Sequence, residues 1–378
     1  MTEDEVRLAR AYLLRVAEPP ATALTLFVAQ HGPVDAAKLV RAGTVPDAVL
    51  NETSARRHID NPAQDLAEGA KAGARLLIPE DEDWPAWALL PLDNAFARGL
   101  RWACPPLGLW VRGAASLTDS LERAVSVVGA RSATGYGDQV AADLGYGLGT
   151  RGMTVVSGAA YGIDGAAHRG ALGAEGRTIA ILACGIDKNY PVAHAQLLER
   201  ITKQGLVITE YPPRTTPAKH RFLVRNRLIA AMGAGTVVVE AGRRSGARNT
   251  AASAAALGRV LMAIPGPVTS AMSIGCHELI RDGLATLVCS HDDVAETVGL
   301  FGDDLAPNRA SVSRPTDGLE ADALRVHEAL TFREGQSAEQ IAEASGIPLA
   351  KVRAILPALE LSDLATRAPT GWHSATSK

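Results

Sequence analysis

The feature that most constrains the fold is a regular alternation of apolar and helical segments between residues 121 and 300. Seven apolar segments have the composition of buried strands, near residues 125–129, 154–157, 178–183, 206–209, 236–239, 260–264 and 285–288. Helical segments separate them, near residues 137–150, 163–174, 192–203, 223–232, 248–258 and 274–283. Apolar strands that alternate with helices predict a mostly parallel sheet, covered by helices on both faces.

The segments before and after this region have a different character. Residues 1–70 show helical spacing and no strand pattern, so we predict a small N-terminal helical domain. Strand-like segments such as Ala74–Ile78 are expected to flank the central sheet, which gives a core of residues 71–300. Residues 301–318 are rich in Pro, Ser and Asn and poor in apolar residues, a composition typical of a linker.

The C-terminal residues 319–378 predict three helices, near residues 320–331, 337–344 and 348–361. The second and third have the pattern of a helix-turn-helix, and the short tail around Trp372 could form a wing. This segment carries six basic and eight acidic residues. A duplex reader needs cations to neutralise phosphates, so a transcription factor is not favoured, and this domain is expected to bind protein or itself.

Two successive strands of the predicted sheet end in turns of small residues. The first reaches Gly129 and places Arg131 two residues later, and the second ends at Ser157 and Gly158. Strand–turn–helix connections of this kind leave backbone N–H groups free to bind an anion. Neighbouring turns at the carboxyl ends of parallel strands would form a phosphate-binding crevice. Arg131 would hold the phosphate, and Gly129 and Ser132 belong to the same turn.

A later strand, near residues 236–239, leads to a third candidate anion site. Glu240 ends that strand, and Ser245 and Gly246 form the turn before the next helix, in which Arg248 adds a positive charge. Glu240 could serve as a catalytic acid or base. We favour the alternative, in which it is a structural acceptor for the surrounding arginines.

A local basic bias surrounds these turns, although the chain has a net charge of −3. Residues 211–250 contain one acidic residue and eight basic ones: Arg214, Lys219, Arg221, Arg225, Arg227, Arg243, Arg244 and Arg248. Such a patch is expected for a polyanion partner. Lys219, Phe222 and Arg225 are three residues apart, so a helix would place them along one side. A stacking aromatic ring between cations is the minimal unit that binds a single strand.

The sequence offers no catalytic or metal-binding constellation. The histidines do not fall in a metal spacing, and neither a Walker A motif nor a nucleophile elbow is present. Asp164 and His168 are four residues apart and could form a pair, which we do not favour. The first turn lacks the G-x-G-x-x-G pattern, so dinucleotide binding is disfavoured and no cofactor is expected.

Cysteine usage and the N-terminal sequence favour a cytoplasmic protein. The four cysteines have no C-x-x-C spacing and read as buried free thiols. The N-terminal residues have no basic region typical of a signal peptide, and no apolar run reaches the ~18 residues of a membrane span. A membrane partner is therefore not expected.

Six motifs in one order resemble the DNA-processing protein A (DprA/Smf) family. They are Ser126–Gly137, Ser157–Asp164, Gly185–Pro191, Glu210–Pro213, Phe222–Ile229 and Pro265-Gly266. The resemblance implies an extended Rossmann-like core with an N-terminal helical domain of the SAM or HhH type and a C-terminal winged-helix-like domain. It further implies single-stranded DNA binding, homodimerisation, and loading of a RecA-type recombinase onto DNA during transformation or repair.

The resemblance also assigns DNA contacts to individual residues. Arg131, Lys219 and Phe222 match contact positions of the family, and Ser157 and Gly158 match its second turn. We add Arg225, Arg227 and Arg248 from the basic segment as further candidate DNA contacts. The family often has two apolar residues where Arg248 and Asn249 stand here.

An enzyme of the α/β phosphoribohydrolase type is the alternative from a different functional class. Such enzymes carry a P-G-G-x-G-T-x-x-E motif in a turn before the catalytic glutamate. The corresponding stretch here, Met232–Glu240, spreads its glycines and its glutamate along a strand. A binding protein therefore fits the sequence better than an enzyme does.

Overall fold

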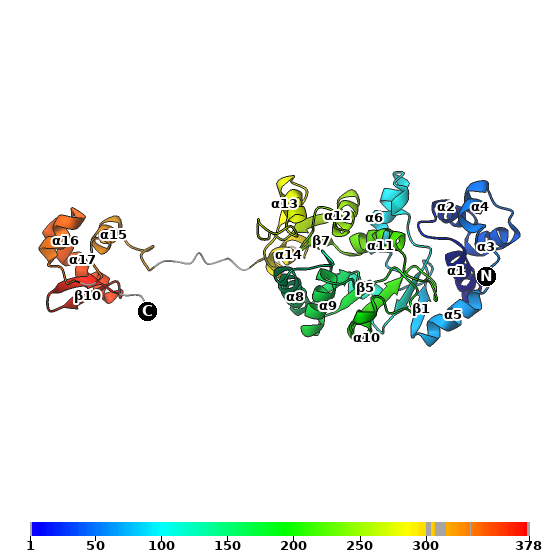
Figure 1. Ribbon diagram of the computed structural model, residues 1–378, viewed down its shortest axis with the longest axis horizontal. Coiled ribbons are helices and arrows are strands. Elements are labelled where there is room, and N and C mark those ends of the chain that lie inside the picture. Colours follow the sequence, from blue (N-terminus) through cyan, green and yellow to red (C-terminus); the bar gives the residue numbers. More distant parts are fainter. Residues whose placement is uncertain (1, 300–303, 307–314, 333, 376–378) are drawn as a thin grey trace. The chain divides into compact units, whose positions relative to one another are not determined.

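The computed structural model describes residues 2–299, 304–306, 315–332 and 334–375. The chain forms two compact units, residues 1–306 and residues 307–378, and each is described by itself (Figure 1). The predicted linker, residues 301–318, falls largely outside the described residues.

One nine-stranded sheet lies at the centre of the described part of the first unit. Its strands are β1 (Ala74–Leu77), β2 (Leu109–Arg112), β3 (Ala124–Val128), β4 (Thr154–Ser157), β5 (Thr178–Ile181), β6 (Leu206–Thr209), β7 (Gly235–Val238), β8 (Val260–Ala263) and β9 (Thr286–Leu287). Their spatial order is β1-β2-β6-β5-β4-β3-β7-β8-β9. The pairs β1–β2 and β2–β6 are antiparallel, and all other pairs are parallel.

The chain reverses its direction of travel across the sheet at β3. From β3 it proceeds outward through β4, β5 and β6, and it then returns to the other side of β3 to form β7, β8 and β9. Val125 of β3 accordingly has Val155 on one side and Gly235 on the other. Open α/β sheets bind ligands at such a switch point, beyond the carboxyl ends of the strands.

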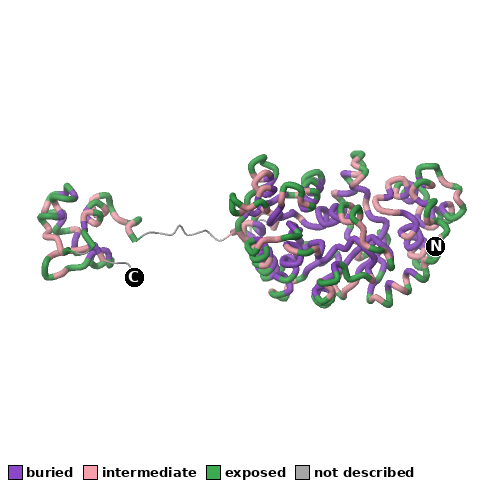
Figure 2. Tube along the Cα trace, in the orientation of Figure 1, coloured by how far each residue is buried: buried purple, intermediate pink, exposed green. Residues whose placement is uncertain are grey.

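Helices cover both faces of the sheet, as Figure 1 shows. One face carries α8 (Gly135–Thr150), α9 (Ile163–Gly173), α10 (Ala195–Gln204) and α14 (His291–Val298), and the other carries α6 (Ala86–Ala97), α11 (Lys219–Met232), α12 (Ala247–Ala256) and α13 (Ile274–Arg281). Strands β3 to β7 are buried at every position, which Figure 2 shows as a purple centre. The predicted mostly parallel sheet with helices on both faces is confirmed, and the predicted strands agree with the observed ones to within two residues at each end.

The N-terminal helices share a hydrophobic core with one edge of the sheet. They are α1 (Glu3–Val16), α2 (Thr22–His31), α3 (Pro33–Ala42), α4 (Asp47–Thr53) and α5 (Pro62–Lys71). Trp110 of β2 is fully buried, and a Cβ atom on Gly69 of α5 would lie 2.4 Å from its ring. The glycine therefore lets α5 approach the sheet closely. The structure groups residues 1–70 with the sheet in one compact unit.

The second unit contains a helix-turn-helix followed by a two-stranded hairpin. Its elements are α15 (Ala321–Glu328), α16 (Ala338–Ser345), α17 (Leu349–Leu361), β10 (Ala365–Ala368) and β11 (Gly371–Ser374). Ser337 caps α16 at its start, and Gly346 ends it with a φ of 68°. The hairpin pairs Arg367 with Trp372, so the predicted wing is confirmed. Lys351 and Arg353 of α17 pair with acidic residues of the same unit, Asp322 and Glu339.

Candidate nucleic-acid interface

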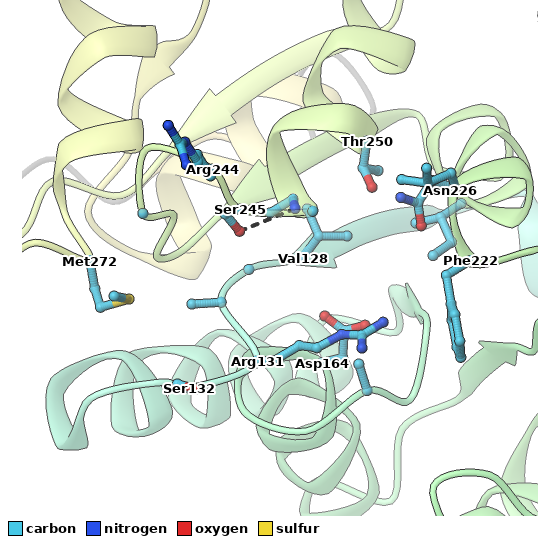
Figure 3. Close-up of a pocket in the computed structure, with 18 of the residues that line it drawn as sticks. Val128, Arg131, Ser132, Asp164, Phe222, Asn226, Arg244, Ser245, Thr250 and Met272 are labelled. Atoms are coloured by element: carbon cyan, nitrogen blue, oxygen red, sulfur yellow. Dashed lines mark hydrogen bonds between the residues drawn. The ribbon is translucent and has the colours of Figure 1, made fainter. Parts of the chain in front are cut away.

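A cavity of about 980 Å³ opens at the switch point of the sheet (Figure 3). The last residue of β3 and the loop after it, residues 128–132, form one wall, and residues 242–247, which follow β7, form another. Helix α11 supplies a third wall. The sequence predicted a crevice between the turns after β3 and β4, whereas the main cavity lies between the turns after β3 and β7. The order of the strands explains this difference, because β3 and β7 flank the switch point.

Helix α11 presents the predicted basic and aromatic side to this cavity. Lys219, Phe222 and Arg225 all line it, as their helical spacing predicted. The guanidinium carbon of Arg131 lies 4.8 Å from the centroid of the Phe222 ring. The Tyr190 ring also contacts Phe222, with 5.7 Å between the two ring centroids. Phe222 is half-buried, so part of its ring remains open to a ligand.

Arg225 supplies a positive charge from beneath the surface. Only 4% of its area is exposed, and its guanidinium donates to the carbonyl oxygen of Ile181. Burial lowers the pKa of Arg225 to about 10, and the Asp164 carboxylate opposes that shift. Arg225 therefore stays charged at neutral pH. A Cβ atom on Gly158 would lie 1.9 Å from its Nη1, so the glycine of the second turn makes room for the guanidinium.

Asp164 is the one carboxylate among the described residues that line the cavity. Its Oδ2 accepts from the backbone N–H of Gly158 at 3.1 Å. Burial raises the pKa of Asp164, while the charge of Arg225 opposes the shift. His168 is bonded to Thr178 instead, at 2.7 Å, and burial lowers its pKa to about 3. The two residues therefore do not form the pair that their spacing allowed.

Glu240 has a structural position behind the cavity. Its carboxylate accepts from the backbone N–H of Thr134 at 2.9 Å and from the Thr134 hydroxyl at 2.6 Å. Thr134 is the N-cap of α8, so this carboxylate occupies the helix end that an external anion would otherwise bind. The expectation that Glu240 accepts from arginines is wrong, because its hydrogen-bond partners belong to the first turn. Glu240 does not line the cavity.

The third turn closes the far side of the cavity. The Ser245 hydroxyl accepts from the backbone N–H of Ala247 at 3.2 Å, which is drawn as the dashed line in Figure 3. Arg243 and Arg244 are exposed on this rim. Five cationic side chains therefore line the cavity, against one carboxylate: Arg131, Lys219, Arg225, Arg243 and Arg244. This balance favours an anionic ligand.

The structure brings most of the candidate residues together. Those that line the cavity are Gly129, Arg131, Ser132, Lys219, Phe222, Arg225, Ser245 and Gly246. Gly158 lines a smaller adjoining cavity, of about 80 Å³, together with Arg131, Tyr190 and Phe222.

Three candidates lie elsewhere. The Ser157 hydroxyl is buried and donates to the Val127 carbonyl at 2.6 Å. Arg227 is 2% exposed, and its guanidinium donates to both carboxylate oxygens of Glu210, at 2.6 and 2.7 Å. Arg248 pairs with Glu278. These side chains are therefore engaged within the protein and do not line the cavity.

Three polar or aromatic residues of the site were not predicted from the sequence: Tyr190, Asn226 and Thr250. Asn226 directly follows Arg225 on the basic helix, and Thr250 follows the third turn by four residues. Tyr190 stands before Pro191 in a loop far away in sequence, and only the fold brings it beside Phe222. The available signal was the position next to Arg225 on the basic helix for Asn226, and polarity near the third turn for Thr250.

Comparisons with known proteins identify the family of the chain. A family model described as DNA recombination-mediator protein A matches residues 75–299. The chain belongs to this family. A second model, the DprA winged helix domain, matches residues 310–371 of this family member.

Similar proteins extend over nearly the whole chain. The putative DNA processing protein DprA of Mycobacterium tuberculosis (strain H37Rv) is 49% identical over 370 residues, which are 98% of this chain and 95% of that protein. Protein Smf of Escherichia coli K12 is 31% identical, over 92% of this chain and 89% of that protein. The X-ray structure of DprA from Streptococcus pneumoniae superposes with a TM-score of 0.64 at 29% identity, over 79% of this chain and 100% of that chain.

These matches confirm the predicted family. Together with the structure, they confirm the extended Rossmann-like fold and the C-terminal winged helix. In the part of the chain that the structure describes, no helix is both long enough and apolar enough to span a membrane.

Proposed function

We propose that this DprA family member binds single-stranded DNA in the switch-point cavity and acts as a recombination mediator. The observation that carries the proposal is the Phe222 ring, partly exposed between the guanidinium groups of Arg131 and Arg225. A base can stack on such a ring only when it is not paired within a duplex. The flanking cations would hold the phosphates on either side of that base.

The interior of the cavity supports binding rather than catalysis. Asp164, its one carboxylate, already accepts a hydrogen bond from the backbone of Gly158. Glu240, the residue that could have served as a catalytic acid, accepts hydrogen bonds from Thr134, the N-cap of α8, outside the cavity. A glycosidic-bond hydrolase needs a carboxylate that is free to reach the sugar. Among the described residues that line the cavity, the phosphoribohydrolase alternative therefore finds no second carboxylate to act on the sugar.

A binding titration tests the proposal. We expect the protein to bind a single strand more tightly than a duplex of the same length, with a log–log salt slope of about −0.7 per neutralised phosphate. Phe222→Ala should weaken single-strand binding, whereas Phe332→Ala, which changes an exposed phenylalanine of the second unit, should not. Equal affinities for single strand and duplex would overturn the proposal.

We further propose that the protein is a homodimer that loads a RecA-type recombinase in the cytoplasm. β9 is an edge strand that pairs only with β8 among the described residues; its own Leu287 is 50% exposed, and Leu284, just before it in the chain, is 58% exposed. An open edge with exposed apolar side chains is a ready site for pairing with a second copy. Loading is tested by recombinase filament growth on single strands coated with a single-strand-binding protein. Unchanged growth in the presence of this protein would contradict the loading step.

A further inference from the structure

A carboxylate on α13 lies beside the third turn, residues 242–247, at the rim of the cavity. Glu278 forms an ion pair with Arg248, the second residue of α12, and its Oε1 lies 3.6 Å from the Nε of Arg243. Arg243 lines the cavity, whereas Glu278 and Arg248 do not. One carboxylate outside the cavity is therefore shared between two arginines of this region.

The two arginines are paired with Glu278 to different degrees. Arg248 donates from its Nη1 to Glu278 Oε2, and this hydrogen bond lowers the pKa of Glu278 more than any other contact does. The Arg248 side chain is 36% exposed, whereas the Arg243 side chain is 78% exposed and meets Glu278 at a longer distance. The neighbouring Arg281 is paired with Asp282. Glu278 is therefore ionised at neutral pH, and it neutralises Arg248 more than Arg243.

Positive charge at the rim of the cavity does not distinguish a single strand from a duplex. An exposed arginine binds phosphate from either, and a duplex carries one negative charge per about 1.7 Å of its axis, about twice the density of one of its strands. Arg243 can be reached from solvent, whereas the ring of Phe222 requires an unpaired base. Charge at the third turn therefore favours a duplex at least as much as a single strand, while stacking favours the single strand.

We propose that Glu278 is a specificity-determining residue, which pairs with Arg243 and Arg248 and so lowers their attraction for the phosphates of a duplex. This inference rests on the proposed function and adds to it a residue that favours single strands. Residues 242–248 contain three arginines, and Glu278 cancels one of their charges. Binding then depends more on stacking against Phe222 and less on charge at the rim.

Glu278→Gln removes the negative charge and keeps the shape of the side chain. We expect this variant to bind a single strand about two- to fivefold more tightly than wild type at low salt, an effect of the size that an exposed ion pair contributes. The log–log salt slope should become steeper by about 0.7 for each additional phosphate contact on a single strand, and by about 0.9 on a duplex. The affinity for a duplex of the same length should increase by a larger factor, so the preference for the single strand should fall.

Two control variants separate the charge of Glu278 from its shape and from the net charge of the protein. Glu278→Asp keeps a carboxylate near both arginines and should bind single strand and duplex as wild type does. Glu339→Gln breaks another exposed ion pair, with Arg353 at 2.6 Å in the second unit, and changes the net charge by the same amount. It should leave both affinities unchanged.

The direction of the change in affinity decides the outcome. If folded Glu278→Gln binds the single strand no more tightly than wild type, the inference is overturned, because a pair that only braces the turn gives no gain when it is broken. A gain that is confined to single strands, or an equal gain in Glu278→Asp, would also overturn it. Thermal melting of the same samples shows whether the variants are folded. Failure of the proposed function is distinguishable, since wild type itself would then show no preference for the single strand.

Discussion

The guanidinium group of Arg131 lies over the ring of Phe222, with 4.8 Å between the guanidinium carbon and the ring centroid. A residue from the loop after β3 and a residue from α11, 91 positions apart in the sequence, thus form one surface. A cation over an aromatic ring is attracted by the ring's electron density. The two side chains therefore hold each other in place in the free protein.

The contact between Arg131 and Phe222 predicts which substitutions change the salt dependence of single-strand binding and which remove a stacked base. Lys219→Ala should flatten the salt slope of single-strand binding by about 0.7, because it removes one phosphate contact. Phe222→Ala should cost about 1–3 kcal/mol and leave the slope nearly unchanged, because it removes a stacked base. Arg131→Ala should show both effects. Affinities at several salt concentrations measure both quantities, and a Phe222→Ala variant that loses thermal stability but not affinity would contradict the stacking role.

Gly158→Ala should affect binding through Arg225. The new methyl group would lie 1.9 Å from Arg225 Nη1 and 2.5 Å from its Cζ, so the guanidinium must leave its position. We expect a loss of about 1–3 kcal/mol in unfolding free energy from overpacking, together with weaker single-strand binding. Gly135→Ala, at a position with open space around the new methyl group, should change neither. Denaturant unfolding measures the stability of both variants, and fluorescence anisotropy of a labelled single strand measures their affinity. A Gly158→Ala protein with the stability and affinity of the wild type would show that Gly158 does not hold Arg225 in this position.

Arg227 should matter for stability and not for DNA binding. Its guanidinium and the Glu210 carboxylate form a buried pair, 2% and 3% exposed. Removing one partner of a buried pair leaves an uncompensated charge and costs about 3–5 kcal/mol. Arg227→Met should therefore lower the melting temperature strongly, while the affinity per folded molecule stays the same. If Arg227→Met has the melting temperature of the wild type but binds DNA weakly, then Arg227 belongs to the binding site after all.

Acid should weaken the contact between the N-terminal helices and α11. Burial raises the pKa of Glu18, but hydrogen bonds from Arg221 and Arg56 outweigh it and lower the pKa to about 2, from an ordinary value of 4.5. The ionised Glu18 carboxylate therefore contributes its full share to the stability of the folded state above pH 4.5, and this contribution is lost as the pH falls toward 2. Glu18→Gln should lower the melting temperature at pH 7, with the difference from wild type shrinking between pH 4.5 and 2. A difference that persists at pH 2 would contradict this assignment.

The open edge at β9 predicts the oligomeric state. Leu287→Asp should convert the proposed dimer to a monomer, because it places a charge on the edge where a second copy would pair. Leu26→Asp, at a leucine of α2 that is 60% exposed, makes the same change elsewhere and should leave the dimer intact. Light scattering at micromolar concentration measures both. If the wild-type protein is a monomer, or if the Leu287→Asp variant is still a dimer, then β9 does not form the dimer interface.

The sequence predicted the sheet and its helices well, because the buried parallel strands are continuous apolar runs, such as Val125–Val128. It also placed Lys219, Phe222 and Arg225 on one side of a helix. It could not tell which arginine of α11 lines the cavity, since Arg225 and Arg227 lie two residues apart on the same helix and are both buried. The fold sets the Glu210 carboxylate against Arg227, and Gly158 against Arg225.

Because Arg225 is buried, dissolved salt should screen its charge less than it screens the exposed cations of the cavity. Salt screens exposed cations such as Lys219 and Arg244, so their attraction for DNA fades as ionic strength rises. Mobile ions cannot surround a guanidinium that is 4% exposed and pinned to the Ile181 carbonyl. Its potential therefore persists at the cavity wall when the surface charges have been neutralised. A strand that has already settled in the cavity should outlast a rise in salt that prevents a new strand from arriving.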